Sequence, residues 1–146
     1  MRQIIDDIIR LAKISSRSGV AGRFLVFSAV GAVGAIAHYL VLIVFHESLG
    51  IHPVIASAVG SIAGAFVNYL LNYHVTFESN IAHGAVMPKF YLIATVGFLL
   101  NVLILWQMVH HFEIHYVVSQ LVATGVVLVW GFVGNSIWTF HRTSGL

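Results

Sequence analysis

Polar side chains that could bind a ligand occur inside long apolar stretches of this sequence, where each costs free energy unless it meets a partner or lines a cavity. Asn amides both donate and accept hydrogen bonds, so they suit the hydroxyl groups of a ligand. Asn68 and Asn72 are four residues apart and share one face of a helix. For a single Asn, a plain helix–helix hydrogen bond is an equal alternative. The set within the apolar stretches is His38, Tyr39, Asn68, Asn72, Asn101, Gln107, Gln120, Asn135 and Ser136, with Trp138 near the end of the last stretch.

Acid–base, nucleophilic and metal chemistry have little support in the sequence. No carboxylate lies inside the apolar stretches and the chain has no cysteine. His38 is the one titratable group expected at mid-depth, either as a proton switch or, the favoured reading, as a neutral hydrogen-bonded ring. No P-loop, nucleophile elbow or paired carboxylate occurs, so we expect no enzymatic activity. Imidazole with carboxylate can bind zinc, but the spacing is unspecific and we expect no metal and no cofactor from His46, Glu47, His52, His110, His111, Glu113 and His115.

Four uncharged stretches must position the polar residues: 24–46, 48–77, 90–112 and 114–141. Each can cross a bilayer core of about 30 Å, which takes about 20 helical residues. The chain is 59% hydrophobic and only 8% charged, against about 25% charged in a soluble domain. Backbone groups in lipid must pair within their own segment, so the spans should be helices. The sequence predicts an all-α membrane protein with spans at about 24–45, 54–75, 90–110 and 117–138.

Basic residues lie on one side of these spans. Arg2, Arg10, Lys13, Arg17 and Arg23 precede the first span, Lys89 lies between the second and third, and Arg142 follows the fourth. The two joints on the opposite side carry no Lys or Arg. The positive-inside rule therefore predicts a multi-pass bacterial inner-membrane protein with both termini in the cytoplasm. Basic residues this few are no signature of nucleic-acid binding, so we expect no nucleic-acid partner.

The N-terminal segment 1–22 is expected to lie outside the four-helix transmembrane domain, 23–146. Apolar side chains at positions 4, 5, 8, 9 and 12 recur at helical spacing, which predicts an amphipathic helix over Arg2–Arg17 at the cytoplasmic membrane surface. A frayed tail is the alternative. Asn80, Gly84 and Pro88 predict an irregular connection over Glu78–Pro88. The two external joints are short, so the spans should form two helical hairpins.

A tandem repeat relates the two hairpins. Val30-Gly31 corresponds to Val96-Gly97 at an offset of 66, and Asn72 corresponds to Asn135 at an offset of 63. Both hairpins cross the membrane twice, so they should be parallel repeats related by an axis along the membrane normal. Chance similarity between apolar runs is the alternative. The pattern Gly60-x-x-x-Gly64 within the first hairpin indicates close helix packing.

These landmarks resemble the GtrA family. The resemblance is carried by Arg23-Phe24-Leu25-Val26, by His38-Tyr39, by the run from Asn68-Tyr69-Leu70-Leu71-Asn72 to Thr76-Phe77, and by Asn135-Ser136-Ile137-Trp138-Thr139-Phe140. It covers about residues 22–142. The resemblance implies a small four-helix bacterial inner-membrane protein that moves polyprenyl-phosphate-linked monosaccharides between leaflets, for surface polysaccharide or cell-wall modification.

The implied substrate assigns roles to two groups of residues. A sugar hydroxyl left unpaired in hydrocarbon costs several kcal/mol, and the amides could serve it in a laterally open groove lined by Asn68, Asn72, Asn101 and Asn135. Phosphate could be captured by charge-assisted hydrogen bonds. The expected substrate-binding residues are Asn68, Asn72, Asn101, Asn135, His38, Tyr39, Gln120 and Trp138, and the expected phosphate-binding residues are Arg23, Lys89 and Arg142, for which topology and lipid contact are equal alternatives.

The chain departs from the family pattern at three positions. Many members carry Asp where Ala35 stands, and its loss weakens any ion-coupled mechanism. Many also carry a basic residue where Tyr73 and Ser136 stand, which leaves fewer cations for phosphate. A membrane adaptor for a polyprenyl-phosphate glycosyltransferase and a small-solute exporter or channel remain alternatives. Membrane lipids are expected neighbours, and the thin four-helix wall favours a homodimer or larger assembly.

Overall fold

The computed structural model describes residues 2–140; at residues 2, 53, 54, 116 and 117 it describes the backbone but not the side chain. The regular secondary structure in that range is helical, without a strand. Four helical segments are long and apolar enough to cross a membrane, namely Val20–Ser48, Ile55–Thr76, His83–His110 and Val118–Thr139. The predicted all-α membrane fold with four spans is confirmed. The chain divides into two compact units, with the boundary between Ser79 and Asn80.

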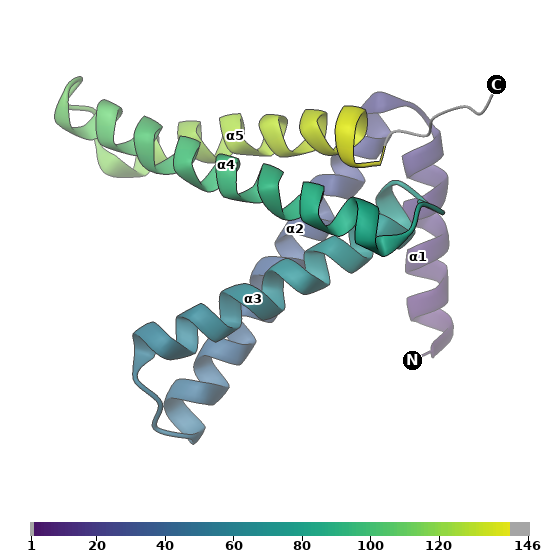
Figure 1. The fold of residues 1–146 in the computed structure, drawn as a ribbon, viewed down its shortest axis with the longest axis horizontal. Helices are drawn as coiled ribbons and strands as arrows, with labels where there is room; N and C mark the ends of the chain where they lie inside the picture. Colours follow the sequence, from purple (N-terminus) through teal and green to yellow (C-terminus); the bar gives the residue numbers. More distant parts are fainter. Residues whose placement is uncertain (1, 141–146) are drawn as a thin grey trace. The chain divides into compact units, whose positions relative to one another are not determined.

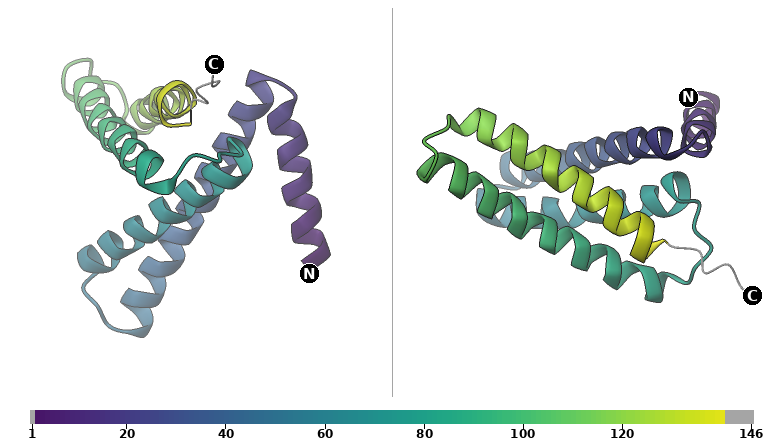
Figure 2. Two further views of the ribbon diagram at one scale, coloured as in Figure 1. Left: turned by 45° about the vertical axis from the view of Figure 1, so that its right-hand side comes forward. Right: turned by 90° about the horizontal axis from the view of Figure 1, so that it is seen from above.

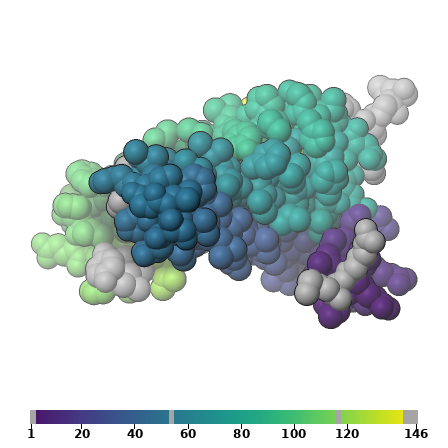
Figure 3. Space-filling model, turned by 90° about the horizontal axis from the view of Figure 1, so that it is seen from below, coloured from purple at the N-terminus to yellow at the C-terminus, as the bar shows by residue number. Residues whose placement is uncertain are grey.

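The first unit begins with helix α1, Arg2–Arg17, which has the bounds that its periodicity predicts. The helix ends at a turn in which Gly19 has a φ of +122°, a conformation that favours glycine. Figure 3 shows the surface of α1 in purple. Its apolar side chains Ile4, Ile5, Ile8 and Leu11 are 52–66% exposed. The helix is therefore free on this face, and its expected position at the membrane surface stays a prediction.

Two spans complete the first unit as an antiparallel hairpin, seen side by side in Figures 1 and 2. Helix α2, Val20–Ile43, continues into a π-helical segment η1, Val44–Ser48. Helix α3, Pro53–Leu71, continues into a second π-helical segment η2, Asn72–Thr76. A small core of Val26, Val30 and Val75 joins the first half of α2 to η2.

Helix α1 is attached to the end of this hairpin by polar contacts. The Ser16 hydroxyl donates to the Thr76 carbonyl oxygen at 2.6 Å. The Arg17 guanidinium donates to both carboxylate oxygens of Glu78, at 2.9 Å and 2.5 Å. The hydrogen bond with Glu78 and its charge raise the pKa of Arg17 above the ordinary value. These contacts place the last turn of α1 against η2.

The second unit is a hairpin of α4, His83–His110, and α5, Tyr116–Gly134, which continues into the π-helical segment η3, Asn135–Thr139. The irregular connection expected over Glu78–Pro88 is wrong in its second half, because α4 starts at His83 and includes Pro88. Pro88 is the sixth residue of the helix, where it removes the hydrogen bond to the Gly84 carbonyl oxygen, yet α4 continues through it. A Cβ added to Gly84 would meet nothing within 4 Å.

The predicted repeat extends to the backbone of both hairpins. Each of the segments η2 and η3 starts at the repeat-related Asn. The Phe77 N–H donates to the Asn72 carbonyl oxygen and the Phe140 N–H to that of Asn135, both at 2.9 Å. Such i→i−5 bonds define a π-helix, which is rare and is frequently found at functional sites. Both hairpins thus end in the same unusual turn around the same residue type.

Candidate functional site

An open groove of about 210 Å³ lies on the α2–α3 hairpin of the first unit. Gly34 is the central residue of the span Val20–Ser48, and Ala65 lies at the centre of Ile55–Thr76. The groove therefore lies about halfway along both spans, where lipid offers no hydrogen bonds. The lining residues are small or polar: Gly31, Gly34, Ala35, His38, Ser61, Gly64, Ala65 and Asn68.

Glycines bring the backbones of α2 and α3 together beneath this groove. A Cβ added to Gly64 would lie 2.6 Å from the Gly34 carbonyl oxygen, and one added to Gly34 would lie 2.9 Å from the Gly64 carbonyl oxygen. A Cβ at Gly60 would meet the ring and the carbonyl oxygen of His38 at 2.6 Å. Larger residues would push the helices apart. The close packing predicted from Gly60-x-x-x-Gly64 therefore holds, and His38 is its partner.

His38 forms one wall of the groove. Its Nε2 atom lies 3.4 Å from the Ser57 hydroxyl oxygen, and its ring stacks on Tyr39 with 5.2 Å between ring centroids. Tyr39 itself is 60% exposed and does not line the groove. The Ser61 hydroxyl donates to the Ser57 carbonyl oxygen at 2.9 Å, which leaves its lone pairs to accept. Binding by Tyr39 stays a prediction.

Asn68 and Asn72 act at different depths of the same helix face. The Asn72 amide nitrogen donates to the side-chain oxygen of Asn68 at 2.7 Å and to the Asn68 carbonyl oxygen at 3.0 Å. Asn72 is fully buried, whereas Asn68 lines the groove. Because its oxygen is engaged, Asn68 has its amide –NH₂ left to donate to a ligand. In this geometry Asn72 orients Asn68 from behind.

Buried oxygen acceptors without a donor occur at matching positions of the two units. No group in the described part of the chain bonds to the Asn72 and Asn135 side-chain oxygens, or to the hydroxyls of Thr76, Thr139 and Ser136. The Asn135 amide nitrogen donates to the Gly131 carbonyl oxygen at 2.8 Å, as Asn72 does to that of Asn68. An unpaired buried polar group costs about 1–3 kcal/mol. The pairs Asn72/Asn135 and Thr76/Thr139 lie in the π-helical segments η2 and η3 of the two units.

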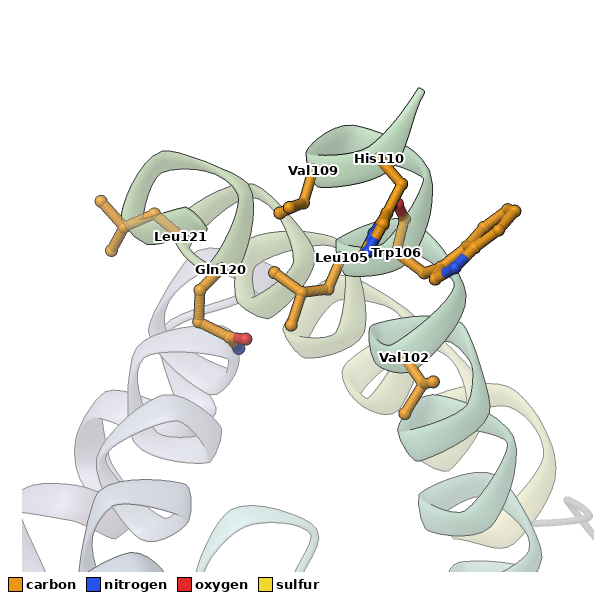
Figure 4. Close-up of a pocket in the computed structure, with 7 residues that line it drawn as sticks. All are labelled: Val102, Leu105, Trp106, Val109, His110, Gln120 and Leu121. Carbon is orange, nitrogen blue, oxygen red and sulfur yellow. The ribbon is translucent and has the colours of Figure 1, made fainter. Parts of the chain in front are cut away.

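The second unit has a larger and more apolar groove beside the α4–α5 joint. Its volume is about 600 Å³. In Figure 4 Leu105 and Val109 point into the space between the helices, Gln120 points in from α5, and Trp106 points away. The Gln120 amide nitrogen donates to the Thr124 hydroxyl at 3.0 Å. Asn101 is half-buried and lines neither this groove nor the others described.

A third groove, of about 320 Å³, lies between α4 and α5 near η3 and is lined by apolar side chains. Trp138 forms part of its wall. The Lys89 ammonium nitrogen lies 5.6 Å from the centroid of the Trp138 ring. Trp138, expected to bind a sugar, thus lines an apolar surface beside a cation.

The predicted site residues are distributed over both units. His38, Asn68 and Asn72 lie together in the first, and Asn101, Gln120, Asn135 and Trp138 belong to the second. The shared groove of all four Asn amides stays a prediction. Among the expected phosphate-binding residues, Arg23 is exposed, Lys89 is half-buried, and Arg142 lies outside the described residues. Among residues 2–140, no group of three His, Asp or Glu side chains could hold a metal ion.

Sequence reasoning missed Ser57 and Ser61 as members of the site. The signal is present in the spacing, because positions 57, 61, 64, 68 and 72 follow one another at intervals of three or four residues and share one helix face. This small and polar stripe runs the length of α3. Its neighbour across the hairpin, Ala35, is the position where many members of the resembled family carry Asp.

The chain matches the model of a known protein family. The family model described as GtrA/DPMS, transmembrane domain, matches residues 26–140. That range holds 115 of the 146 residues and includes the first hairpin from residue 26 onward, the whole second hairpin and the lining of all three grooves. A comparison with curated proteins found no match for this chain.

Proposed function

The chain belongs to the GtrA/DPMS transmembrane-domain family, and we propose that it moves polyprenyl-phosphate-linked monosaccharides across the bacterial inner membrane. The family and the four spans make it a multi-pass membrane protein. The observation that carries the proposal is the small polar groove at mid-depth of the first hairpin. A polar groove halfway across the bilayer fits a cargo whose polar part must pass through oil.

The cost of moving the sugar lies in its hydroxyl groups. Each hydroxyl that enters hydrocarbon without a partner costs about 2–7 kcal/mol. The groove offers the Asn68 –NH₂ as a donor, the Ser61 oxygen as an acceptor, and the His38 ring as either. The polyprenyl chain can stay in lipid throughout. The open face of the groove lets the sugar enter sideways while the tail remains outside.

The expected orientation in the membrane is consistent with capture of the phosphate at the cytoplasmic side. The Lys and Arg residues all flank the cytoplasmic ends of the predicted spans, where a cationic surface attracts phosphate. We propose that the chain lies in the inner membrane with both termini in the cytoplasm and without catalytic activity of its own. Labelling of a terminal cysteine tag from the periplasmic side would contradict this orientation.

The test is reconstitution of the purified protein in liposomes with a polyprenyl-phosphate monosaccharide whose exposure in each leaflet is followed by an impermeant oxidant. We expect faster exchange than in empty liposomes. Asn68→Leu should lower the rate by about tenfold, because one donor at the groove is worth about 1.5 kcal/mol. The Asn72 amide keeps its backbone acceptor at 3.0 Å in this variant, so the fold should survive.

A matched control is Thr95→Val, which changes an exposed polar residue of α4 whose hydroxyl donates only to the Tyr91 carbonyl oxygen. Thr95→Val should leave the exchange rate unchanged. Equal exchange in liposomes with and without the protein would contradict transport. Unchanged exchange by folded Asn68→Leu would contradict the role of the groove.

A second candidate is an anchor for a polyprenyl-phosphate glycosyltransferase. The family is described as a transmembrane domain, a description that would also fit the membrane part of a larger assembly. We also propose a glycosyltransferase partner and a homodimer. Copurification of the enzyme with the wild type and with Asn68→Leu alike, without lipid exchange by either, would favour the anchor.

A further inference from the structure

The second unit contains an apolar groove that ends beside a lone cation, and we propose that this groove binds the part of a polyprenyl phosphate nearest its phosphate. The choice of ligand rests on the proposed function. The site itself rests on the groove of about 320 Å³ between α4 and α5 and on Lys89. It is separate from the polar groove of the first unit.

The lining of the groove is apolar, which suits a hydrocarbon chain but not the hydroxyl groups of a sugar. Its lining consists of Leu92, Ile93, Val96, Trp130, Val133, Gly134, Ile137 and Trp138. The indole N–H of Trp130 donates to the Ile93 carbonyl oxygen at 3.0 Å and is therefore engaged within the protein. A chain that lies there contacts close-packed apolar atoms on both helices.

Lys89 supplies the charge that a phosphate requires. Its ammonium nitrogen lies 5.6 Å from the centroid of the Trp138 ring, and a cation over an aromatic face is held by the ring quadrupole. The same ammonium has three N–H donors. In the described part of the second unit, residues 80–140, Lys89 is the only Lys or Arg residue. Glu113 is the only acidic residue there, and it lies beyond the other end of α4. No carboxylate in that part competes for Lys89.

The other groove of this unit is a natural comparison. It is also largely apolar, at about 600 Å³, but it lies beside the joint that carries Glu113 and has no Lys or Arg. A phosphate would be repelled there. Lys89 and Val96 are seven residues apart, which corresponds to roughly 10 Å of helix. The groove therefore has room along α4 for the first part of a chain that leads away from a phosphate at Lys89.

The test measures binding rather than transport. Full-length protein in detergent is titrated with polyprenyl phosphate and with polyprenol, with native mass spectrometry as the readout. We expect polyprenyl phosphate to bind at least tenfold more tightly than polyprenol. Lys89→Gln should remove this preference and leave polyprenol binding unchanged. Val133→Trp, which fills the groove from an exposed position, should weaken both ligands about tenfold.

Matched controls are Lys13→Gln on α1 and Val129→Trp, one turn earlier on α5 and also exposed; neither should change binding. Ile137→Trp replaces Val133→Trp if that variant does not fold. Equal binding of the two lipids, an unchanged Kd for Lys89→Gln and the groove-filling variants, or full displacement by an equimolar anionic phospholipid would overturn the proposal. Exchange without this binding pattern would refute the groove alone, and the binding pattern without exchange would refute transport alone.

Discussion

The α2–α3 and α4–α5 hairpins carry the same repeat but pack differently at the centre of the bilayer. In the first, the Gly34 and Gly64 backbones are nearly in contact, and the space beside them is a polar groove. In the second, the repeat counterpart of Gly64 is Val127, which packs with Trp130 against Gly97. The glycine contact leaves polar groups at the surface, whereas the Trp contact yields apolar grooves. Small residues thus decide which hairpin can serve a polar ligand.

The largest effect should come from a substitution that forces the Gly34 and Gly64 backbones apart. Gly64→Ala places a methyl group 2.6 Å from the Gly34 carbonyl oxygen, and backbone at that distance cannot rotate away. We expect a loss of about 2–3 kcal/mol, the upper range for overpacking. The free energy of unfolding by steric trapping in micelles is the measurement. Gly125→Ala, where an added Cβ meets nothing within 4 Å, should show no loss. Equal losses would refute the special packing of the first hairpin.

Filling the groove should affect transport more than stability. Ala35 lines the groove and is exposed, and its repeat counterpart at an offset of 66 is Asn101. Ala35→Leu should lower lipid exchange by about tenfold, because the added side chain occupies much of the space for the sugar. Asn101→Leu should change exchange less than twofold. The readout is the liposome exchange rate of folded protein. A comparable loss for Asn101→Leu would mean that both hairpins supply the path.

A weaker effect is expected at the glycine of the second hairpin. A Cβ at Gly97 would lie 3.2 Å from a Val127 methyl group and 3.4 Å from the Trp130 ring. Side chains can shift by a few tenths of an ångström, so Gly97→Ala should cost less than about 1 kcal/mol. Thermal unfolding followed by size-exclusion chromatography gives the comparison with Gly64→Ala. A loss as large as that of Gly64→Ala would remove the contrast between the hairpins.

The smallest effect should follow from the contact between α1 and the first hairpin. The Arg17 side chain is 72% exposed, and salt screens exposed ion pairs. Arg17→Gln should loosen α1 at low salt and matter little at high salt, as read by hydrogen exchange of the last turn of α1. Glu78 raises the pKa of Arg17, so the guanidinium stays charged, and the pair with the ionised Glu78 is kept, from neutral to mildly alkaline pH. We therefore expect no change from neutral to mildly alkaline pH; a loss there would contradict the pairing.

The spans, their hairpins and α1 could be predicted from the sequence because apolar length and helical spacing are local properties. The start of α4 could not, because Pro88 and Gly84 are typical helix breakers, yet α4 includes both. The contact of His38 with Gly60 depends on the register between two helices. The sequence pattern groups Asn72 with the groove-lining residues, yet Asn72 bonds to Asn68 and is buried. Its depth follows from the rotation of α3, which periodicity alone does not fix.

Photolabelling tests the central claim most directly. A polyprenyl-phosphate monosaccharide with a diazirine on the sugar is incubated with reconstituted protein, irradiated, and mapped by peptide mass spectrometry. The account predicts labels on α2 and α3 near Ala35 and Ala65, and their loss in Ala35→Leu. Labels confined to α4 and α5, or unchanged labelling in that variant, would contradict it.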